Sequence, residues 1–408
     1  MEDQKPSSSN RRKFIINAAK VAGVGAVGFI YFKGCTNDES EVVPPPIGKH
    51  VFLTKPYLHS ILAERVSIRW ISNLLSFGWV EYGEAGKLDQ KAVLVKDGLV
   101  NAYNRVHEIH LEQLKPGTVY HYRVASKHIK NFDGEDTINY GETIYSDTYS
   151  FTTFNHTAKE VSWLVLNDIH DRPESFPLLL KLNKNNPYDF VFLNGDMFDF
   201  QSDEEQIIDH LLKPCTDTFA TQKPMLFVRG NHEMRGKFAH GLKDYFSNPA
   251  GLYFTYQLGP VFIIVLDSGE EEIQTGWDDS DAYRLKQAAW MEKIMQSEEY
   301  RKAKYRVVMM HIPPQYSFEH KGSQHCKKVF SPLFDQYKVD IVISGHKHVF
   351  GVHPPVKAVH DYPVIIGGGP LPGNRTLIKV KANEEQLHVE MLKDDGTVVG
   401  EYKVKAVR

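Results

Sequence analysis

The chain has 408 residues, of which 42% are hydrophobic and 24% are charged, and its formal net charge is −3. This composition is close to that of soluble globular proteins and excludes a disordered chain, a collagen-like chain and a multi-span membrane protein. With so small a net charge we expect no broad basic surface and no nucleic-acid partner. The length predicts two or three domains. The three cysteines are too few for a disulfide scaffold.

Residues 1–48 are typical of an export signal or anchor followed by a linker. Arg11-Arg12-Lys13 precedes an apolar stretch at 14–32 and resembles a twin-arginine export signal, with a single anchoring helix as the alternative. Cys35 resembles the lipid-attachment cysteine of a bacterial envelope protein, although Lys33 is unfavourable in such a motif. These features predict an exported protein of the bacterial envelope, periplasmic or at the cell surface. Membrane attachment through the N-terminus or Cys35 is an option.

Residues 49–154 predict an all-β domain. Alternating apolar side chains recur between turn signals at 64–72, 119–124 and 147–154, and no helical period stands out. The segments SIRWIS, FGWVEYGE and LEQLKPGTVYHYRV resemble a fibronectin type III-like β-sandwich and the N-terminal domain of purple acid phosphatases. We assign this domain no chemistry and expect it to pack against the next domain and to shape its cleft. Its histidines His107, His110 and His121 are interpreted as solvent-facing or rim residues.

Residues 155–408 predict an α/β domain in which apolar strands alternate with helices. Helical patterns occur at 175–184, 204–213 and 282–297, and the segment 376–405 predicts strands that close the sheet. Buried strands are predicted at 161–166, 190–193, 224–228, 261–266, 305–310 and 339–344.

Polar side chains follow five of these strands. They are Asp168 and His170, then Asp196 and Asp199, then Asn231, His232 and Glu233, then His311, and finally His346 and His348. Open α/β sheets bind ligands at the carboxyl ends of their strands, so we expect these side chains to meet at one edge. One such cluster could arise by chance, whereas five in succession indicate a site.

Carboxylate, imidazole and amide ligands suit divalent first-row metal ions, and the cysteines lie outside the clusters. A carboxylate can bridge two ions that are roughly 3.5–4 Å apart. Glycines precede Asp196, Asn231 and His346, which lets the chain turn sharply and approach the ions.

The motifs D-x-H, G-D, G-N-H-E, a lone H and G-H-x-H, in this order, resemble those of the calcineurin-like metallophosphoesterases over residues 160–350. The resemblance implies a β-sandwich flanked by helices and two divalent ions, with Mn, Fe, Zn and Mg as candidates. It implies one ion held by Asp168, His170 and His348, a second held by Asn231, His311 and His346, and Asp196 as the bridge. It further implies that His232 binds a phosphoryl oxygen and protonates the leaving alkoxide, with Glu233 orienting the His232 ring.

One position departs from the purple enzymes. Asp199 stands where they have a tyrosine that binds ferric iron, and His170 is a histidine that they lack. We therefore expect a colourless centre. The role of Asp199 is left open between an outer partner of the ligands and a surface residue.

These features predict an exported phosphatase that acts on small phosphomonoesters by in-line attack of a metal-bridging hydroxide. A phosphodiesterase acting on nucleotides or lipid headgroups is the alternative, and a non-catalytic binding protein is a third hypothesis. Arg172 and Arg235 are candidates for binding the phosphate group through paired hydrogen bonds. The segment 315–328 is interpreted as a long loop in which His320 and His325 are solvated, with a position on the pocket wall as the alternative for both. Pairing of Cys215 with Cys326 is left open.

Overall fold

The computed structural model describes residues 48–62, 64–134, 137–155, 157–246, 251–272 and 279–406. Residues 49–408 form one compact unit, separate from residues 1–48. The predicted export segment and Cys35 lie outside the described residues. Within the described ranges, no helix combines the length and apolarity needed to cross a bilayer.

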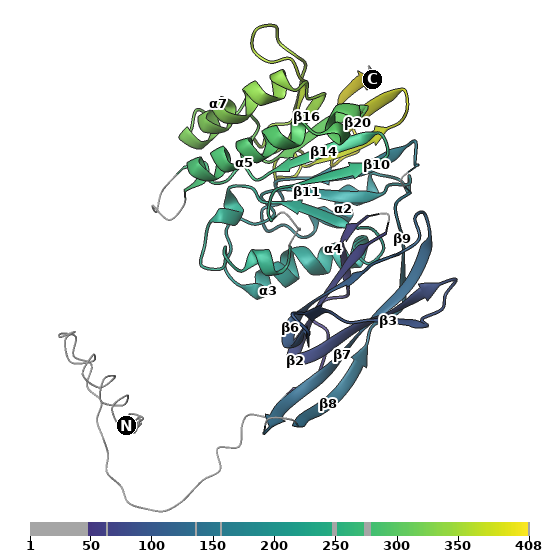
Figure 1. Ribbon diagram of the computed structural model, residues 1–408. Coiled ribbons are helices and arrows are strands. Elements are labelled where there is room, and N and C mark those ends of the chain that lie inside the picture. The colour runs from purple at the N-terminus through teal and green to yellow at the C-terminus, as the bar shows by residue number, and fades with distance from the viewer. Residues whose placement is uncertain are drawn as a thin grey trace, which may run out of the picture. The chain divides into compact units, whose positions relative to one another are not determined.

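The first part of the compact unit is all-β, as predicted (Figure 1). Its long second strand pairs antiparallel with four others, and the seventh strand pairs with two more. Inward-facing side chains such as Ile68, Trp70 and Tyr122 form its core. The likeness to a fibronectin type III domain stays a prediction. The strands are β1(Tyr57–Ile61), β2(Val66–Glu84), β3(Gln90–Ala92), β4(Val95–Lys96), β5(Leu99–Val100), β6(Ala102–Leu111), β7(Val119–Asp133), β8(Thr137–Tyr145) and β9(Tyr149–Thr152).

His107 in β6 is a core residue, so its interpretation as a rim histidine is wrong. Its side chain is 3% exposed and stacks on Trp70 with ring centroids 4.9 Å apart. Its Nε2 lies 2.8 Å from the Ser76 hydroxyl. Burial lowers the pKa of His107 to about 3, because the charged imidazolium loses its hydration there.

We expect the folded protein to lose stability in acid through His107. The unfolded chain takes up the proton near pH 6.5 and the folded chain only near pH 3, so the contribution is complete above pH 6.5 and declines as the pH falls. The total is about 4–5 kcal/mol. Urea unfolding at several pH values should show a flatter pH dependence for His107→Gln than for the wild type. Equal slopes in the two proteins would contradict this assignment.

The second part contains two six-stranded sheets packed face to face. The first has the order β12-β11-β10-β19-β20-β21 and the second the order β13-β14-β15-β16-β18-β17. The strands are β10(Val161–Leu166), β11(Phe190–Asn194), β12(Met225–Val228), β13(Phe254–Leu258), β14(Val261–Leu266), β15(Tyr305–Met310), β16(Ile341–Ser344), β17(Gly351–His353), β18(Val364–Ile366), β19(Thr376–Ala382), β20(Gln386–Lys393) and β21(Val398–Lys405).

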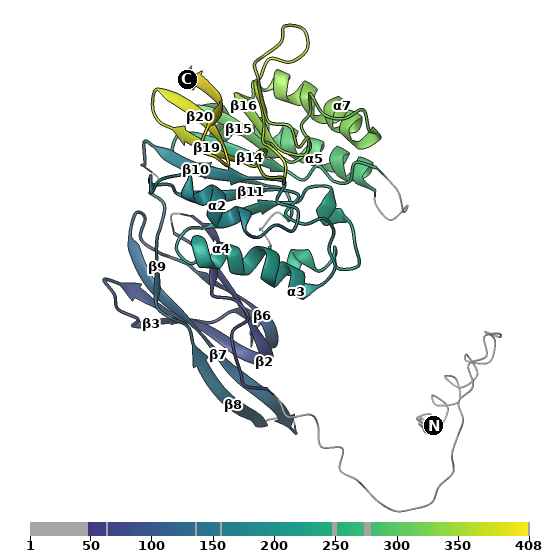
Figure 2. The same cartoon turned by 180° about the vertical axis from the view of Figure 1, so that it is seen from behind.

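Helices cover both outer faces of this pair of sheets (Figure 1 and Figure 2). Those on the first sheet are α2(Ser175–Lys181), α3(Glu204–Ile207), the π-helical turn η1(Ile208–Leu212) and α4(Lys213–Thr218); those on the second are α5(Ser280–Met295), α6(Glu298–Lys302) and α7(Lys321–Gln336). Short 3₁₀ turns occur at η2(His232–Met234) and η3(Leu242–Asp244). The predicted β-sandwich flanked by helices is therefore confirmed.

In each sheet, the strands that precede the predicted ligands run parallel to one another. Their carboxyl ends therefore lie at the same edge of that sheet. β10, β11 and β12 are parallel neighbours, as are β14, β15, β16 and β18. The C-terminal strands add antiparallel to β10, as predicted for the closing segment.

The long loop predicted for residues 315–328 is wrong in its second half, because α7 begins at Lys321. Cys326, Phe330 and Phe334 recur every four residues and pack into the core beneath the second sheet. The helical spacing of these apolar residues was missed in the sequence because the first turns of the helix carry mostly polar side chains. Cys326 and Cys215 are both free and buried in separate cores.

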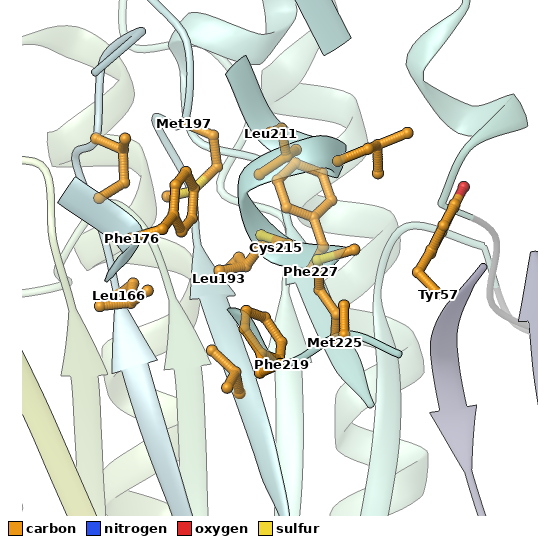
Figure 3. Close-up of a cluster of buried hydrophobic side chains, with 14 of the residues drawn as sticks. Tyr57, Leu166, Phe176, Leu193, Met197, Leu211, Cys215, Phe219, Met225 and Phe227 are labelled. Carbon is orange, nitrogen blue, oxygen red and sulfur yellow. The ribbon is translucent and has the colours of Figure 1, made fainter. Parts of the chain in front are cut away.

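The all-β part packs beside β12, as expected from the sequence. Tyr57 joins a cluster of apolar side chains that includes Cys215 and Phe227 (Figure 3). The Tyr57 hydroxyl donates to the carbonyl of Tyr245 at 3.0 Å, and the Tyr122 hydroxyl donates to that of Thr221 at 2.7 Å. The expectation that this part shapes the cleft is wrong, since the residues that line the pocket described below all lie between 196 and 348.

Candidate metal centre

The loops after the strands hold most of the predicted ligands in an unusual backbone conformation. Positive φ angles occur at Asp168 (51°), His170 (49°), Asp196 (54°), His346 (74°) and His348 (53°). For residues with a Cβ this conformation costs on the order of 1 kcal/mol each, and it concentrates at functional sites. This backbone strain accompanies loop conformations that turn the five side chains towards one another.

Two glycines allow the loops to approach closely. Gly195 has φ 80°, and a Cβ there would lie 2.5 Å from Nδ1 of His311. A Cβ on Gly345 would lie 2.4 Å from an oxygen of Asp168. Any larger residue at either position would push the strand ends apart.

Four of the predicted ligands meet in a first group. Asp168, His170, Asp196 and His348 each offer one ligand atom, and these atoms lie within 4.8 Å of one another. His170 Nε2 is 3.0 Å from His348 Nε2 and 3.6 Å from Asp196 Oδ2. This set of nitrogen and carboxylate donors could hold one divalent ion.

A second group shares Asp196 with the first. Asp196, His311 and His346 form the cluster, and His311 Nε2 lies 2.9 Å from Asp196 Oδ2. Asn231 Oδ1 lies 3.0 Å from His346 Nδ1 and completes the set predicted from the sequence. All seven predicted ligands are thus brought together, with Asp196 in the position of the bridge.

The protonation of His311 tests whether this donor set fits a metal. Its Nδ1–H donates to the carbonyl of Asn194 at 2.8 Å, so Nε2 is the ring atom left for a metal ion. Nε2 is fully buried and lies 2.9 Å from Asp196 Oδ2. In the metal-free site a proton on Nε2 joins the two groups, and a cation could take its place.

Charges in the site support the same conclusion. Burial raises the pKa of Asp168 and Asp196, but the facing histidines, His311 above all, lower both below the usual range. Burial in turn lowers the pKa of His311, and the two aspartates more than offset this and raise it. The metal-free site therefore collects protons on His170 and His311, which metal ions displace.

Outer partners fix the orientation of the ligands. Asp199 Oδ1 lies 2.8 Å from His170 Nδ1 and so directs His170 Nε2 into the site, which settles the role that the sequence left open. The amide of Asn167 donates to Asp168 at 2.5 Å and to the carbonyl of Gly368 at 2.9 Å. The sequence analysis missed Asn167, although it directly precedes a predicted ligand.

Glu233 does not orient the ring of His232, so this prediction is wrong. The Glu233 carboxylate instead accepts from the backbone N–H groups of Asp196 (2.9 Å), Met197 (2.7 Å), Phe198 (3.3 Å) and Gly230 (2.6 Å). It clamps the loop that carries Asp196 to the loop that carries Asn231.

We expect Glu233→Gln to destabilise the protein by about 3–5 kcal/mol, because the fully buried carboxyl group accepts from four backbone donors and an amide NH₂ group would replace one of its acceptor oxygens. Urea unfolding of the metal-free protein measures this loss. The exposed Glu205→Gln is the control and should change stability by less than about 0.5 kcal/mol. Equal stabilities for the two variants would exclude the clamp.

His232 borders a pocket of about 280 Å³ above the ligands. Its Nδ1 contacts the carbonyl of Asp199 at 2.6 Å, so Nδ1 carries the proton and Nε2 is the free nitrogen. Arg235 also lines the pocket, with Nη1 3.4 Å from His232 Nε2. Arg172 instead donates to the carbonyl of His170 and is not among the lining residues.

The remaining lining residues extend beyond the sequence prediction. Glu271, Glu272 and Phe318 were not expected there, whereas His320 lines the pocket as the alternative interpretation of this residue had it. His325 lies on α7, where its Nδ1 is 3.0 Å from Asp281, and it does not line the pocket.

Comparisons with known proteins agree with this architecture. Residues 162–350 match the family model of the calcineurin-like phosphoesterases. Over 354 residues the chain is 23% identical to the probable purple acid phosphatase 20 of Arabidopsis thaliana, covering 77% of this chain and 70% of the relative. Purple acid phosphatase 23 of the same plant is 23% identical over 284 residues, which cover 62% of this chain and 59% of that protein.

Solved structures show the same fold. A purple acid phosphatase, PPD1, from yellow lupin (Lupinus luteus) seeds superposes with a TM-score of 0.65 and 16% identity, covering 86% of this chain and 74% of that one. The structure of PhoD gives a TM-score of 0.59 with 10% identity and covers 86% and 88%. Fold and site together define a metal-dependent phosphoester hydrolase. Residues 162–350 of this chain match the calcineurin-like phosphoesterase family, as their motifs indicated.

Proposed function

We propose that this chain hydrolyses small phosphomonoesters with two divalent ions, drawn from Mn, Zn, Mg and ferrous iron. The observation that carries the proposal is that Asp196 belongs to both ligand groups, directly beneath a pocket bordered by His232 and Arg235. When bound, such a pair of ions polarises the phosphoryl oxygens and makes a water molecule acidic enough to supply the nucleophile.

The protein residues supply the groups that handle the ester. Because the Asp199 carbonyl holds the Nδ1 proton of His232, a second proton taken up by the ring is carried on Nε2, which borders the pocket and delivers it to the leaving oxygen. Arg235 is held by Glu270 through two contacts of 2.7 Å, so its guanidinium is fixed beside His232. There it binds the charged oxygens of the phosphoryl group.

The size of the pocket favours a monoester over a diester. At about 280 Å³ it is slightly smaller than typical ligand pockets, which measure about 300–1,000 Å³. A phosphoryl group with one small leaving group fits such a volume more readily than a diester with two bulky arms.

Initial rates of the Mn-loaded full-length protein test this proposal. We expect chelator-sensitive turnover of an aryl phosphomonoester to exceed that of the matching bis-aryl diester. A preference for the diester would instead establish the phosphodiesterase alternative. No turnover of either ester with two ions bound would favour a binding protein.

We further propose that the enzyme is exported to the cell envelope. Arg11-Arg12 ahead of an apolar stretch supports export, and Cys35 supports lipid attachment. Cell fractionation of wild type and Arg11→Lys/Arg12→Lys protein tests export, and incorporation of labelled fatty acid with and without Cys35→Ser tests attachment. A wild-type protein confined to the cytoplasm would refute export.

A further inference from the structure

The loop after β14 carries two consecutive glutamates that belong to none of the motifs. Glu271 is 7% exposed, and its Oε2 lies 2.9 Å from Nε2 of His346. Its Oε1 contacts Nδ1 of His320 on the wall of the pocket. A single carboxylate therefore touches a predicted metal ligand on one side and a pocket residue on the other.

The contact with His346 decides which nitrogen of that ring can bind a metal. A neutral imidazole carries one N–H, and a carboxylate beside Nε2 draws the proton to Nε2. In the metal-free ring Nδ1–H donates to Asn231 Oδ1 at 3.0 Å, and a metal ion that displaces this proton would be bound by Nδ1. Carboxylates that hold the far nitrogen of a ligand histidine increase its basicity and fix its orientation.

Glu271 is held in place by parts of the fold that do not belong to the ligand set. Arg284 of α5 is 1% exposed, and its guanidinium donates to the carbonyls of Ser268 (2.7 Å) and Glu270. At the start of α7, the N–H of Gly322 donates to the carbonyl of Glu271 at 2.9 Å. The carboxylate is therefore in position before any ion binds.

We propose that Glu271 is a positioning residue for the second metal ion, acting through the ring of His346. The inference rests on the proposed two-ion function. The neighbouring Glu270 instead holds Arg235, which lines the same pocket. Glu271 would thus orient a metal ligand, whereas Glu270 fixes the guanidinium group that is proposed to bind the phosphoryl group.

Equilibrium dialysis of the full-length protein against graded Mn²⁺, with elemental analysis of bound metal, tests the proposal. We expect the wild type to bind two ions per chain. Glu271→Ala should weaken the second ion by about 10–100-fold and leave the first unchanged. Glu271→Gln keeps an oxygen that can accept from Nε2–H and should recover part of this loss. The Mn²⁺ electron paramagnetic resonance spectrum should change from a coupled pair to a single ion in Glu271→Ala.

Glu205→Gln is the control, because Glu205 is exposed on α3 and does not line the pocket. It should bind both ions as the wild type does. Wild-type affinity for both ions in Glu271→Ala would overturn the inference and leave the two-ion function intact. Loss of both ions together with a lower Tm of the metal-free variant would also overturn it, as a general structural role. Fewer than two ions in the wild type would instead refute the proposed function.

Discussion

Asp196→Asn is expected to lower kcat on phosphomonoesters by about 10⁴-fold, which corresponds to about 5–6 kcal/mol. Asp196 is the only described residue that belongs to both ligand groups, and its Oδ2 lies 2.9 Å from His311 Nε2 and 3.6 Å from His170 Nε2. An amide has no net charge with which to hold two cations, so we expect the variant to bind metal poorly as well.

Initial rates and bound metal, measured on the same sample, check this result. Asp203→Asn is the control, because Asp203 caps α3 at the surface and asparagine caps helices about as well as aspartate. A variant that lacked the Asp196 carboxylate but kept two ions and a tenth of the wild-type kcat would contradict the assignment of the bridge.

His232→Asn is expected to have an effect that depends on the leaving group. For an alkyl phosphate, whose leaving alkoxide needs a proton, we expect kcat to fall by about 10²–10³-fold. For 4-nitrophenyl phosphate, whose leaving group departs without protonation, we expect a loss of less than about tenfold. The physical reason is that His232 Nε2 is the ring nitrogen that faces the pocket, while Nδ1 is occupied by the Asp199 carbonyl.

The pH profile gives an independent check of His232. Burial lowers its pKa below the usual value, and nearby His170 and Arg235 act in the same direction, although Asp196 opposes them. Only the protonated ring can donate, so kcat for the alkyl phosphate should decline as the pH rises through this lowered pKa. We expect His232→Asn to lose that decline. Equal losses for the two substrates would show that His232 binds the phosphoryl group without transferring a proton.

The strands and the grouping of the candidate ligands could be predicted because both signals are local in the sequence. Apolar runs mark buried strands, and the polar residues that follow each run lie at the strand ends whatever the distant packing is. Asp168, Asp196 and His311 are examples of this pattern. Their meeting point followed from the rule that parallel strands end at a common edge.

Residues that act through tertiary contacts were not predictable in this way. Glu271 reaches His346 across 75 positions of the chain, counted as 346 − 271, and nothing near it in the sequence indicates that contact. The role of Glu233 depended on where the N–H groups of residues 196–198 point, which the motif does not specify. His107 is different, because it alternates with Ile109 and Leu111 on the inward face of β6, and that period of two could have identified it.

The most direct test of the central claim is the number of metal ions that the active protein binds. We predict two divalent ions per full-length chain. Dialysis against a chelator should remove both ions together with phosphomonoester turnover, and added Mn²⁺ should restore turnover as the second ion binds. Full turnover with one ion per chain, or turnover that survives complete removal of metal, would contradict a centre built on a shared Asp196.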